Sequence, residues 1–427
     1  MLRKRAGGRT SRLQGPRIGL ALAGGGALGG IYEIGALLAL TDALEGVDFN
    51  DLHVYVGVSS GSLIAAGLAN GLSAAELHRI YIENASAEHP ITPAIFQMPA
   101  LGEYYRRAAG VPELLLSLLW RYLQNPLERG IWGSLQGLGR AIPTGVFDSK
   151  PVARFLTRLF TTGGRTNDFR KLKHRLFVVA TDLDSGESVE FGAKGYDHVP
   201  IARAVQASTA LPGLFPPTRI DGRYFVDGAL KKTLHASVAL SEGANLVVCI
   251  NPIVPFDANL ARKRGKPKHE NLVDGGLPVV LSQTFRALIH SRMQVGMAKY
   301  GTTYKNADVL LFEPNPDDAE MFFANVFSYA NRRRVCEHAY RHTIRELARR
   351  ESELAPIFAR HGISLRREVL RQDQPHIRIS PALRSASALT LQRRLDSSLQ
   401  QLAQWLQAHR GSPPATRAVL AGTQRTK

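Results

Sequence analysis

Gly57-Val58-Ser59-Ser60-Gly61 is the stretch of this sequence whose residue types and spacing best fit nucleophilic chemistry. It follows an apolar run at residues 54–56 and precedes a helical pattern that includes Leu63. A serine at such a strand-to-helix turn is held clear of the backbone, where its hydroxyl can attack a substrate. The spacing assigns this role to Ser59, because a motif centred on Ser60 would lack its first glycine. A turn that merely joins two elements is the alternative interpretation.

A glycine loop, Gly24-Gly25-Gly26-Ala27-Leu28-Gly29, separates a predicted strand over 17–23 from a predicted helix over about 29–44. Such a loop presents backbone N–H groups at a helix N-terminus, where negative charge is favoured. Binding a dinucleotide would need a carboxylate at the end of the next strand, where the serine motif stands instead. A Walker loop would need a Gly-Lys-Ser/Thr sequence, which is absent. The remaining use is an oxyanion hole, whose N–H groups donate to the charged oxygen of a tetrahedral intermediate.

A reactive serine needs a base, and the sequence offers two candidates. Asp227-Gly228-Ala229 follows a predicted strand, and His235 comes eight residues after Asp227. A triad that includes His235 stays open, although we favour an ordinary residue at the start of a helix. In a Ser–Asp pair, the Asp227 carboxylate would need a shielded site or a direct hydrogen bond to act as a base at neutral pH.

Strand, loop and helix alternate in the first part of the chain, which predicts an α/β fold with a parallel sheet and helices on its faces. Residues 188–191 are predicted to pair back on a strand at 175–181, and residues 219–226 to form a hairpin around Asp221-Gly222. Further elements are predicted downstream: a strand at 245–250, a basic loop over 257–271, a helix over about 276–300 and one continuous helix over about 317–353.

The length of 427 residues predicts one large domain with additions, or two domains. Prolines, glycines and short leucine-rich helices mark an insertion that fits either a cap able to lie on an interface or an ordinary helical subdomain. The predicted parts are a basic N-terminal segment over 1–16, a catalytic domain over 17–315 with this helical insertion at 89–145, a helical C-terminal extension over 316–410 and a disordered tail over 411–427.

Charge and cysteine content limit the partners and the compartment. The net charge of +18 fits an anionic membrane surface, an acidic protein or nucleic acid, but no zinc spacing, RNA-binding aromatic motif or basic heptad region points to nucleic acid. Only two cysteines are present, Cys249 and Cys336, which fits a reducing compartment. No stretch approaches the ~20 apolar residues of a spanning helix. We therefore expect a cytoplasmic protein in peripheral contact with membrane, and secretion without a cleaved signal stays open.

The glycine loop, the serine motif and Asp227-Gly228-Ala229 resemble, in this order, the motifs of the patatin-like phospholipase family. Segments 180–183 and 207–217 are similar too, and the resemblance covers about residues 18–250. It implies a three-layer α/β/α sandwich, with Ser59 as the nucleophile, Asp227 as the base and an oxyanion hole at Gly24–Gly26. It also implies a lipid ester substrate and chemistry without histidine, metal or cofactor.

Two departures from the family pattern bear on activity. Relatives usually carry arginine or lysine at the position of Leu28, and a second glycine at the position of Ala229. Lys231 and Lys232 follow, and we hypothesise that one of them supplies charge near the site.

Our interpretation is a serine lipid acyl hydrolase of the phospholipase A or lysophospholipase type. The alternatives are an acyltransferase that uses the same acyl-enzyme, or a non-catalytic lipid- or protein-binding module with an impaired site.

Overall fold

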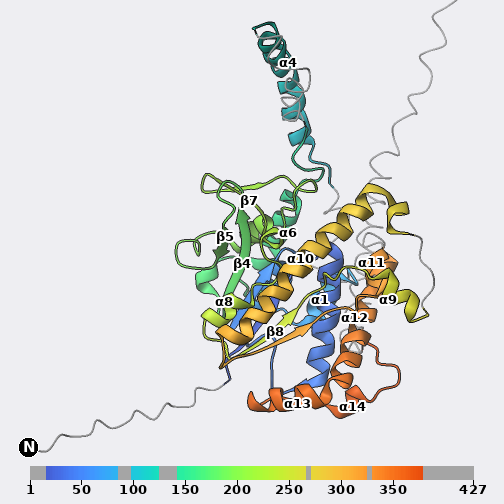
Figure 1. Cartoon of the computed structure of the whole chain (residues 1–427). Helices are drawn as coiled ribbons and strands as arrows, with labels where there is room; N and C mark the ends of the chain where they lie inside the picture. The colour runs from blue at the N-terminus through green and yellow to red at the C-terminus, as the bar shows by residue number, and fades with distance from the viewer. Residues whose placement is uncertain (1–15, 85–97, 125–141, 266–270, 325–328, 378–427) are drawn as a thin grey trace, which may run out of the picture. The chain divides into compact units, whose positions relative to one another are not determined.

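The computed structural model describes residues 16–84, 98–124, 142–265, 271–324 and 329–377 (Figure 1). These residues belong to one of two units into which the chain divides, and the other unit consists of residues outside these ranges. Most of the predicted N-terminal segment, much of the predicted insertion and all of the predicted tail lie outside the described residues.

A sheet with the strand order β6-β7-β4-β3-β1-β8-β9 forms the centre of the described unit, with β5 paired to β4. The pairs β4–β3, β3–β1, β1–β8 and β8–β9 are parallel, whereas β5, β7 and β6 join in antiparallel fashion. The strands span Ile18–Leu22 (β1), Val54–Val58 (β3), Arg175–Asp182 (β4), Ser188–Phe191 (β5), Thr218–Ile220 (β6), Arg223–Asp227 (β7), Leu246–Ile250 (β8) and Asp308–Phe312 (β9).

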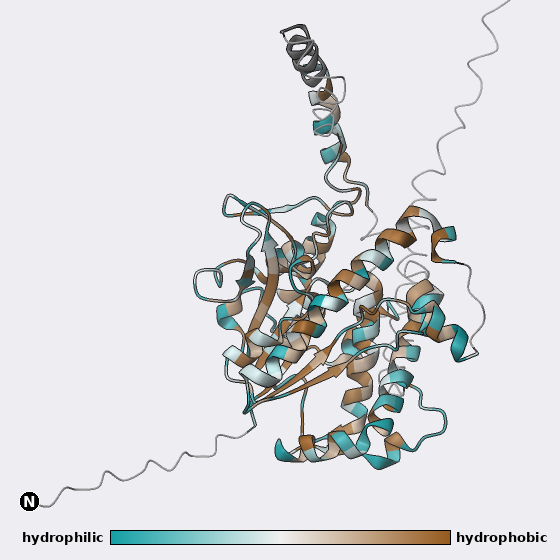
Figure 2. Cartoon of the chain, viewed as in Figure 1, coloured by the Kyte–Doolittle hydropathy of each residue, from teal (hydrophilic) through white to brown (hydrophobic). Residues whose placement is uncertain are grey.

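Alternate residues of the central strands face two separate apolar clusters. Leu246, Val248 and Ile250 of β8 belong to the first cluster. Val247 and Cys249, which alternate with them, belong to the second. Successive side chains of a strand point to opposite faces, so both faces of the sheet are covered. Figure 2 shows the apolar character of these strands.

Helices supply the other side of each cluster. The second cluster contains residues of α8 (Ala236–Ser241) and of α10 (Gly276–Thr303), and α10 crosses in front of the strands in Figure 1. This three-layer arrangement with a mainly parallel sheet confirms the predicted α/β/α sandwich. The helices of the first cluster include α1 (Gly26–Ala43), α2 (Ser60–Ala69), α3 (Ala74–Tyr81), α6 (Lys150–Phe160), α7 (Ile201–Ser208) and α12 (Tyr329–Arg349).

Local signals explain where several elements begin and turn. Ser73 caps α3, and its hydroxyl accepts from the Glu76 N–H while the Glu76 carboxylate accepts from the Ser73 N–H. Asp221 and Gly222 have φ values of 49° and 82°, and two positive φ angles allow the tight turn between β6 and β7. The hairpins predicted at 175–191 and 219–226 are confirmed.

Two sequence-based expectations are wrong in the second half of the chain. The continuous helix expected over 317–353 is divided among α11 (Ala319–Phe323), α12 and α13 (Glu351–Arg360). Asp318 starts α11 by accepting from the Met321 N–H, and Ala324 ends it in an extended conformation. The loop expected over 257–271 contains α9 (Ala258–Lys263), which Asp257 caps.

Helices also occupy the described parts of the predicted insertion and extension. The insertion contains α4 (Leu101–Gln124), and the region after α13 contains the short α14 (Arg367–Leu370). A small separate sheet pairs β10 (Ser364–Leu365) with β2 (Leu44–Glu45), directly after α1. In the described ranges no helix combines the length and the apolar character needed to cross a membrane.

Candidate active site

The turn that carries Ser59 joins β3 to α2 at very close backbone distances. A Cβ on Gly57 would lie 2.4 Å from Ser62 Cα, and a Cβ on Gly61 would lie 2.6 Å from the Ala23 oxygen. Glycine is therefore needed at both positions for the strand and the helix to meet. Ser59 itself has φ 51° and ψ −126°, a conformation that L residues rarely adopt and that often accompanies functional strain.

The Ser59 hydroxyl donates a hydrogen bond of 2.6 Å to Oδ2 of Asp227. Asp227 ends β7, and its other oxygen, Oδ1, accepts from the Ala229 N–H at 2.9 Å. Ser59 is 5% exposed and Asp227 is 2% exposed, so water has little access to their bond. A buried hydroxyl held against a carboxylate can pass its proton to that carboxylate as the oxygen attacks a carbonyl carbon.

Burial changes the acid–base character of this carboxylate. Desolvation raises the pKa of Asp227 from 3.8 to about 6, and the hydrogen bonds from Ser59 and Ala229 partly oppose that rise. A carboxylate with this pKa is still mostly deprotonated at neutral pH, and it is a stronger base than an exposed aspartate. The shielded site and the direct hydrogen bond that a Ser–Asp pair would need are thus both present.

Ser208 contacts the turn that carries Ser59. The sequence analysis did not assign this contact. The Ser208 hydroxyl accepts from the Ser59 N–H at 2.8 Å and donates to the Val179 oxygen at 2.6 Å. This bridge ties the turn to the neighbouring strand β4 through the last residue of α7. The sequence analysis had marked segment 207–217 as similar to the family, but nothing in that segment indicated a role for the serine.

The glycine loop places the N-terminus of α1 beside Ser59. The helix begins at Gly26, and its first backbone hydrogen bond joins the Gly29 N–H to the Gly25 oxygen at 3.0 Å. The N–H groups of residues 26–28 precede that bond and have no partner within the helix. A Cβ on Gly24 would lie 2.9 Å from Ser59 Cβ, so the loop and the serine are in direct contact. An anionic oxygen formed at Ser59 would develop next to these donors.

A model of the family described as patatin-like phospholipase matches residues 20–240, which is more than half of the chain. The chain belongs to this family. All the contacts described above at Ser59 and at the glycine loop fall within the matched residues.

The curated relatives that match are distant in sequence. An uncharacterized NTE family protein of Mycobacterium tuberculosis is 24% identical over 245 residues, which are 57% of this chain and 32% of that protein. The chain thus spans about a third of the length of this relative. A cGAMP-activated phospholipase of Vibrio cholerae is 25% identical over 240 residues, which are 52% of this chain and 56% of that protein.

The chain is also similar to solved structures, at low sequence identity and low TM-score. VipD from Legionella pneumophila is 15% identical, covers 92% of this chain and 86% of its own, and has a TM-score of 0.33. A human GIVD cytosolic phospholipase A2 is 18% identical, with coverage of 60% and 44% and a TM-score of 0.25. Scores this low carry no argument about the site.

The other candidates from the sequence are His235, Lys231 and Lys232, and they contact residues other than Ser59 and Asp227. His235 is buried at the start of α8, no hydrogen bond joins it to Ser59 or Asp227, and burial and the Lys232 charge lower its pKa to about 3. Lys231 pairs with Glu187 at 2.7 Å, whereas Lys232 bonds the Ser237 hydroxyl at 2.8 Å and lies over the Tyr300 ring. The Lys231 charge is thus paired with a carboxylate, whereas Lys232 contacts a hydroxyl and an aromatic ring, and the charge that we hypothesised near the site stays a prediction.

Leu28 packs into the first apolar cluster and is 8% exposed, so its side chain supplies no charge beside the loop. Within the residues that the structure describes, no group of three or more His, Cys, Asp or Glu side chains could hold a metal ion.

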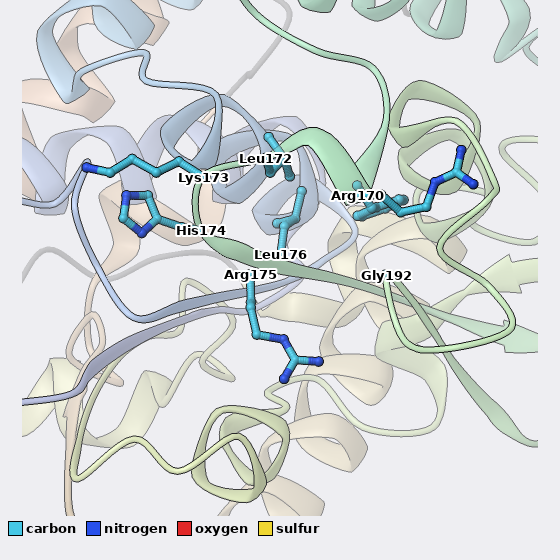
Figure 3. Close-up of a pocket in the computed structure, with 8 residues that line it drawn as sticks. Arg170, Leu172, Lys173, His174, Arg175, Leu176 and Gly192 are labelled. Carbon is cyan, nitrogen blue, oxygen red and sulfur yellow. The ribbon is translucent and has the colours of Figure 1, made fainter.

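A pocket of about 230 Å³ lies at the other end of the sheet, where β4 begins (Figure 3). Arg170, Lys173 and Arg175 line it, but their charges are paired with acidic side chains, and Lys173 and Arg175 extend in different directions in Figure 3. Ser59 follows the opposite end of the parallel strand β3, so this pocket is not part of the candidate site.

Gly24 and Gly30 provide a matched pair of alanine substitutions. A Cβ on Gly24 would crowd Ser59 Cβ and the Ala229 Cβ at 2.9 and 3.0 Å, so Gly24→Ala has to displace Ser59 or Ala229. We expect its kcat to fall about a hundredfold. A Cβ on Gly30 would lie 3.5 Å from Ser60 Cβ, an ordinary contact inside a helix. We expect Gly30→Ala to keep its activity and to gain up to ~1 kcal/mol of stability.

Ester hydrolysis and urea denaturation of both variants test this pair. If both variants keep wild-type activity, the glycine loop does not contribute to the reaction through its contact with Ser59.

Proposed function

We propose that this protein is a serine lipid acyl hydrolase of the phospholipase A or lysophospholipase type, which cleaves carboxylic esters of membrane lipids through a Ser59–Asp227 dyad. Membership of the patatin-like phospholipase family supports a lipid-hydrolysing activity. The observation that carries the finer proposal is the 2.6 Å hydrogen bond between the Ser59 hydroxyl and the buried Asp227 carboxylate.

In the first half of the reaction, Ser59 Oγ attacks the ester carbonyl carbon and its proton passes to Asp227 Oδ2. The carbonyl oxygen becomes an oxyanion and accepts hydrogen bonds from the N–H groups at the start of α1. Each such donor is typically worth about 3–4 kcal/mol of transition-state stabilisation. The intermediate then collapses, the C–O bond to the leaving alcohol breaks, and the alcohol takes the proton from Asp227.

In the second half, a water molecule replaces the alcohol. Asp227 accepts a proton from this water as its oxygen attacks the acyl carbon on Ser59. Collapse of the second tetrahedral intermediate breaks the bond to Ser59 Oγ, which recovers the proton from Asp227. The products are a fatty acid and the free enzyme, and the cycle needs no cofactor.

We place this chemistry in the cytoplasm, at the surface of anionic membranes. The net charge of +18 supports attraction to anionic lipid head groups. Cys249 and Cys336 are both buried as free thiols, which fits a reducing compartment. Nothing in the chemistry proposed for Ser59 calls for nucleic acid as a partner.

A panel of diacyl and lysophospholipid vesicles tests the proposed reaction, with Ser59→Ala as the control. We expect the wild type to release free fatty acid and the variant to release none. If an added alcohol receives the acyl chain in place of water, the protein is instead an acyltransferase. Vesicle binding without hydrolysis of any lipid would identify it as a non-catalytic binding module whose site is impaired at Leu28.

A further inference from the structure

Helix α10 has apolar side chains on two opposite faces. One face packs against the sheet, where Met293 and Tyr300 are buried in the second apolar cluster. The opposite face is exposed to solvent. We call the large apolar side chains of this exposed side the outward stripe, and its members, which are between 39% and 70% exposed, are Leu277, Val280, Leu281, Phe285, Leu288 and Val295.

The spacing of these residues places the outward stripe along one side of α10. Leu277, Leu281 and Phe285 follow one another at intervals of four, and Leu288 and Val295 continue on the same side at helical intervals. The apolar side chains of a helix in a globular protein normally face its core. An exposed apolar row of this kind marks a place where another apolar phase or partner binds.

Two contacts fix α10 beside the edge of the sheet that carries Ser59. Gln283 exchanges hydrogen bonds of 2.8 and 3.1 Å with the backbone of Phe256, in the segment that follows β8. Pro252 of the same segment would meet a Cβ on Gly25 at 2.6 Å, so this segment also covers the glycine loop. Further along the helix, Arg292 donates to the Leu230 oxygen, three residues after Asp227. Helix α10 therefore runs past the segment that covers the glycine loop and past the segment that follows Asp227.

The charge of α10 fits an anionic partner. Residues 276–303 include three cations, Arg286, Arg292 and Lys299, and no aspartate or glutamate. Arg292 and Lys299 are exposed, and each lies one helical turn beyond a member of the outward stripe. Because the whole chain carries +18, a second copy of itself would be repelled, whereas anionic lipid head groups would be attracted.

We propose that the outward stripe of α10 inserts into the head-group region of an anionic bilayer, with Arg292 and Lys299 contacting lipid phosphates. This deepens the proposed function and rests on it, since a lipid substrate is what brings a bilayer to this edge of the sheet. Apolar side chains flanked by cations are the composition with which interfacial helices bind anionic membranes.

The test compares the wild type with Leu281→Glu/Leu288→Glu in sedimentation with phosphatidylcholine–phosphatidylglycerol vesicles. The matched control is Ser352→Glu/Ala359→Glu, which adds the same charge at exposed positions of α13. This helix contacts β10, which pairs with β2 at the C-terminal end of α1, far from the glycine loop. We expect vesicle affinity to fall about tenfold or more in the stripe variant and to stay near the wild-type value in the control.

A fluorescent label keeps the test valid should the stripe variant fold poorly. Leu281→Cys and Ala359→Cys can each carry an environment-sensitive dye, because the native Cys249 and Cys336 are fully buried. We expect vesicles to shift the emission of the dye at position 281 to the blue and to leave the dye at position 359 unchanged. Equal emission changes at the two positions would overturn the proposal.

Hydrolysis of p-nitrophenyl butyrate, a soluble ester, separates this proposal from the proposed function. We expect the stripe variant to hydrolyse it within about twofold of the wild-type rate while losing activity on vesicles. Wild-type vesicle binding through the stripe without hydrolysis of either substrate would support the docking surface and contradict the proposed reaction. Vesicle binding that survives in the stripe variant, or a wild-type dimer that this variant dissociates, would overturn the docking surface.

Discussion

Replacing Ser59 with alanine is expected to lower the rate of lipid ester hydrolysis by roughly four to six orders of magnitude. Removing the nucleophile of a serine hydrolase has effects of about this size, because the loop donors and substrate binding cannot replace the covalent step. The comparison is made with purified wild type and Ser59→Ala on one lipid substrate. Circular dichroism of Ser59→Ala establishes that it keeps the fold.

Ser60→Ala is a matched control within the same motif. The Ser60 hydroxyl is buried and has no hydrogen-bond partner among the described residues, so its removal breaks no hydrogen bond there. We expect Ser60→Ala to retain activity within a few fold of the wild type. An inactive Ser60→Ala beside an active Ser59→Ala would move the nucleophile to the neighbouring serine.

Replacing Asp227 with asparagine is expected to remove activity and to stabilise the fold. Asparagine keeps the shape of the side chain but cannot accept the proton of Ser59, and we expect kcat to fall by roughly three to four orders of magnitude. Burial raises the pKa of Asp227 from 3.8 to about 6. Between these pH values the folded protein therefore keeps a proton on this carboxyl group that the unfolded chain has lost. Stability therefore falls as pH rises from about 4 to about 6, and above pH 6 the charged carboxylate costs about 3 kcal/mol.

The measurements are urea unfolding at neutral pH and the pH dependence of kcat/KM. We expect Asp227→Asn to unfold at higher urea than the wild type, and wild-type kcat/KM to rise with pH to a plateau above about 6. Asp221→Asn removes an exposed carboxylate in the turn before β7, where asparagine is well tolerated, and we expect it to change neither property. A wild-type activity that stays constant through this pH range would contradict Asp227 as the base.

The glycine-dependent parts of the site are predictable from sequence, because backbone contacts force the residue type. Gly57 and Gly61 stand where a Cβ would collide with the chain, and the Asp221-Gly222 turn needs positive φ angles. Constraints of this kind are local, so they leave a readable pattern. The three-layer fold follows in the same way from the alternation of strands and helices.

Contacts that depend on long-range pairing are not predictable in this way. Ser59 and Asp227 are 168 residues apart, and they meet because β4 pairs with β3 on one side and with β7 on the other. The Ser208 bridge depends on the same arrangement, and a lone serine near a helix end carries no sign of it. The division of the helix expected over 317–353 depends on Asp318, which caps α11 and also pairs with His338 of α12.

Covalent labelling of the folded wild type with a fluorophosphonate lipid analogue tests the central claim most directly. Such a reagent phosphonylates an activated serine, and peptide mass spectrometry locates the modified residue. We expect one adduct, on Ser59, which is absent from Ser59→Ala and forms much more slowly in Asp227→Asn. An active wild type that acquires no adduct on Ser59, or an adduct on another serine that abolishes hydrolysis, would contradict the assignment of Ser59 and Asp227 as the catalytic pair.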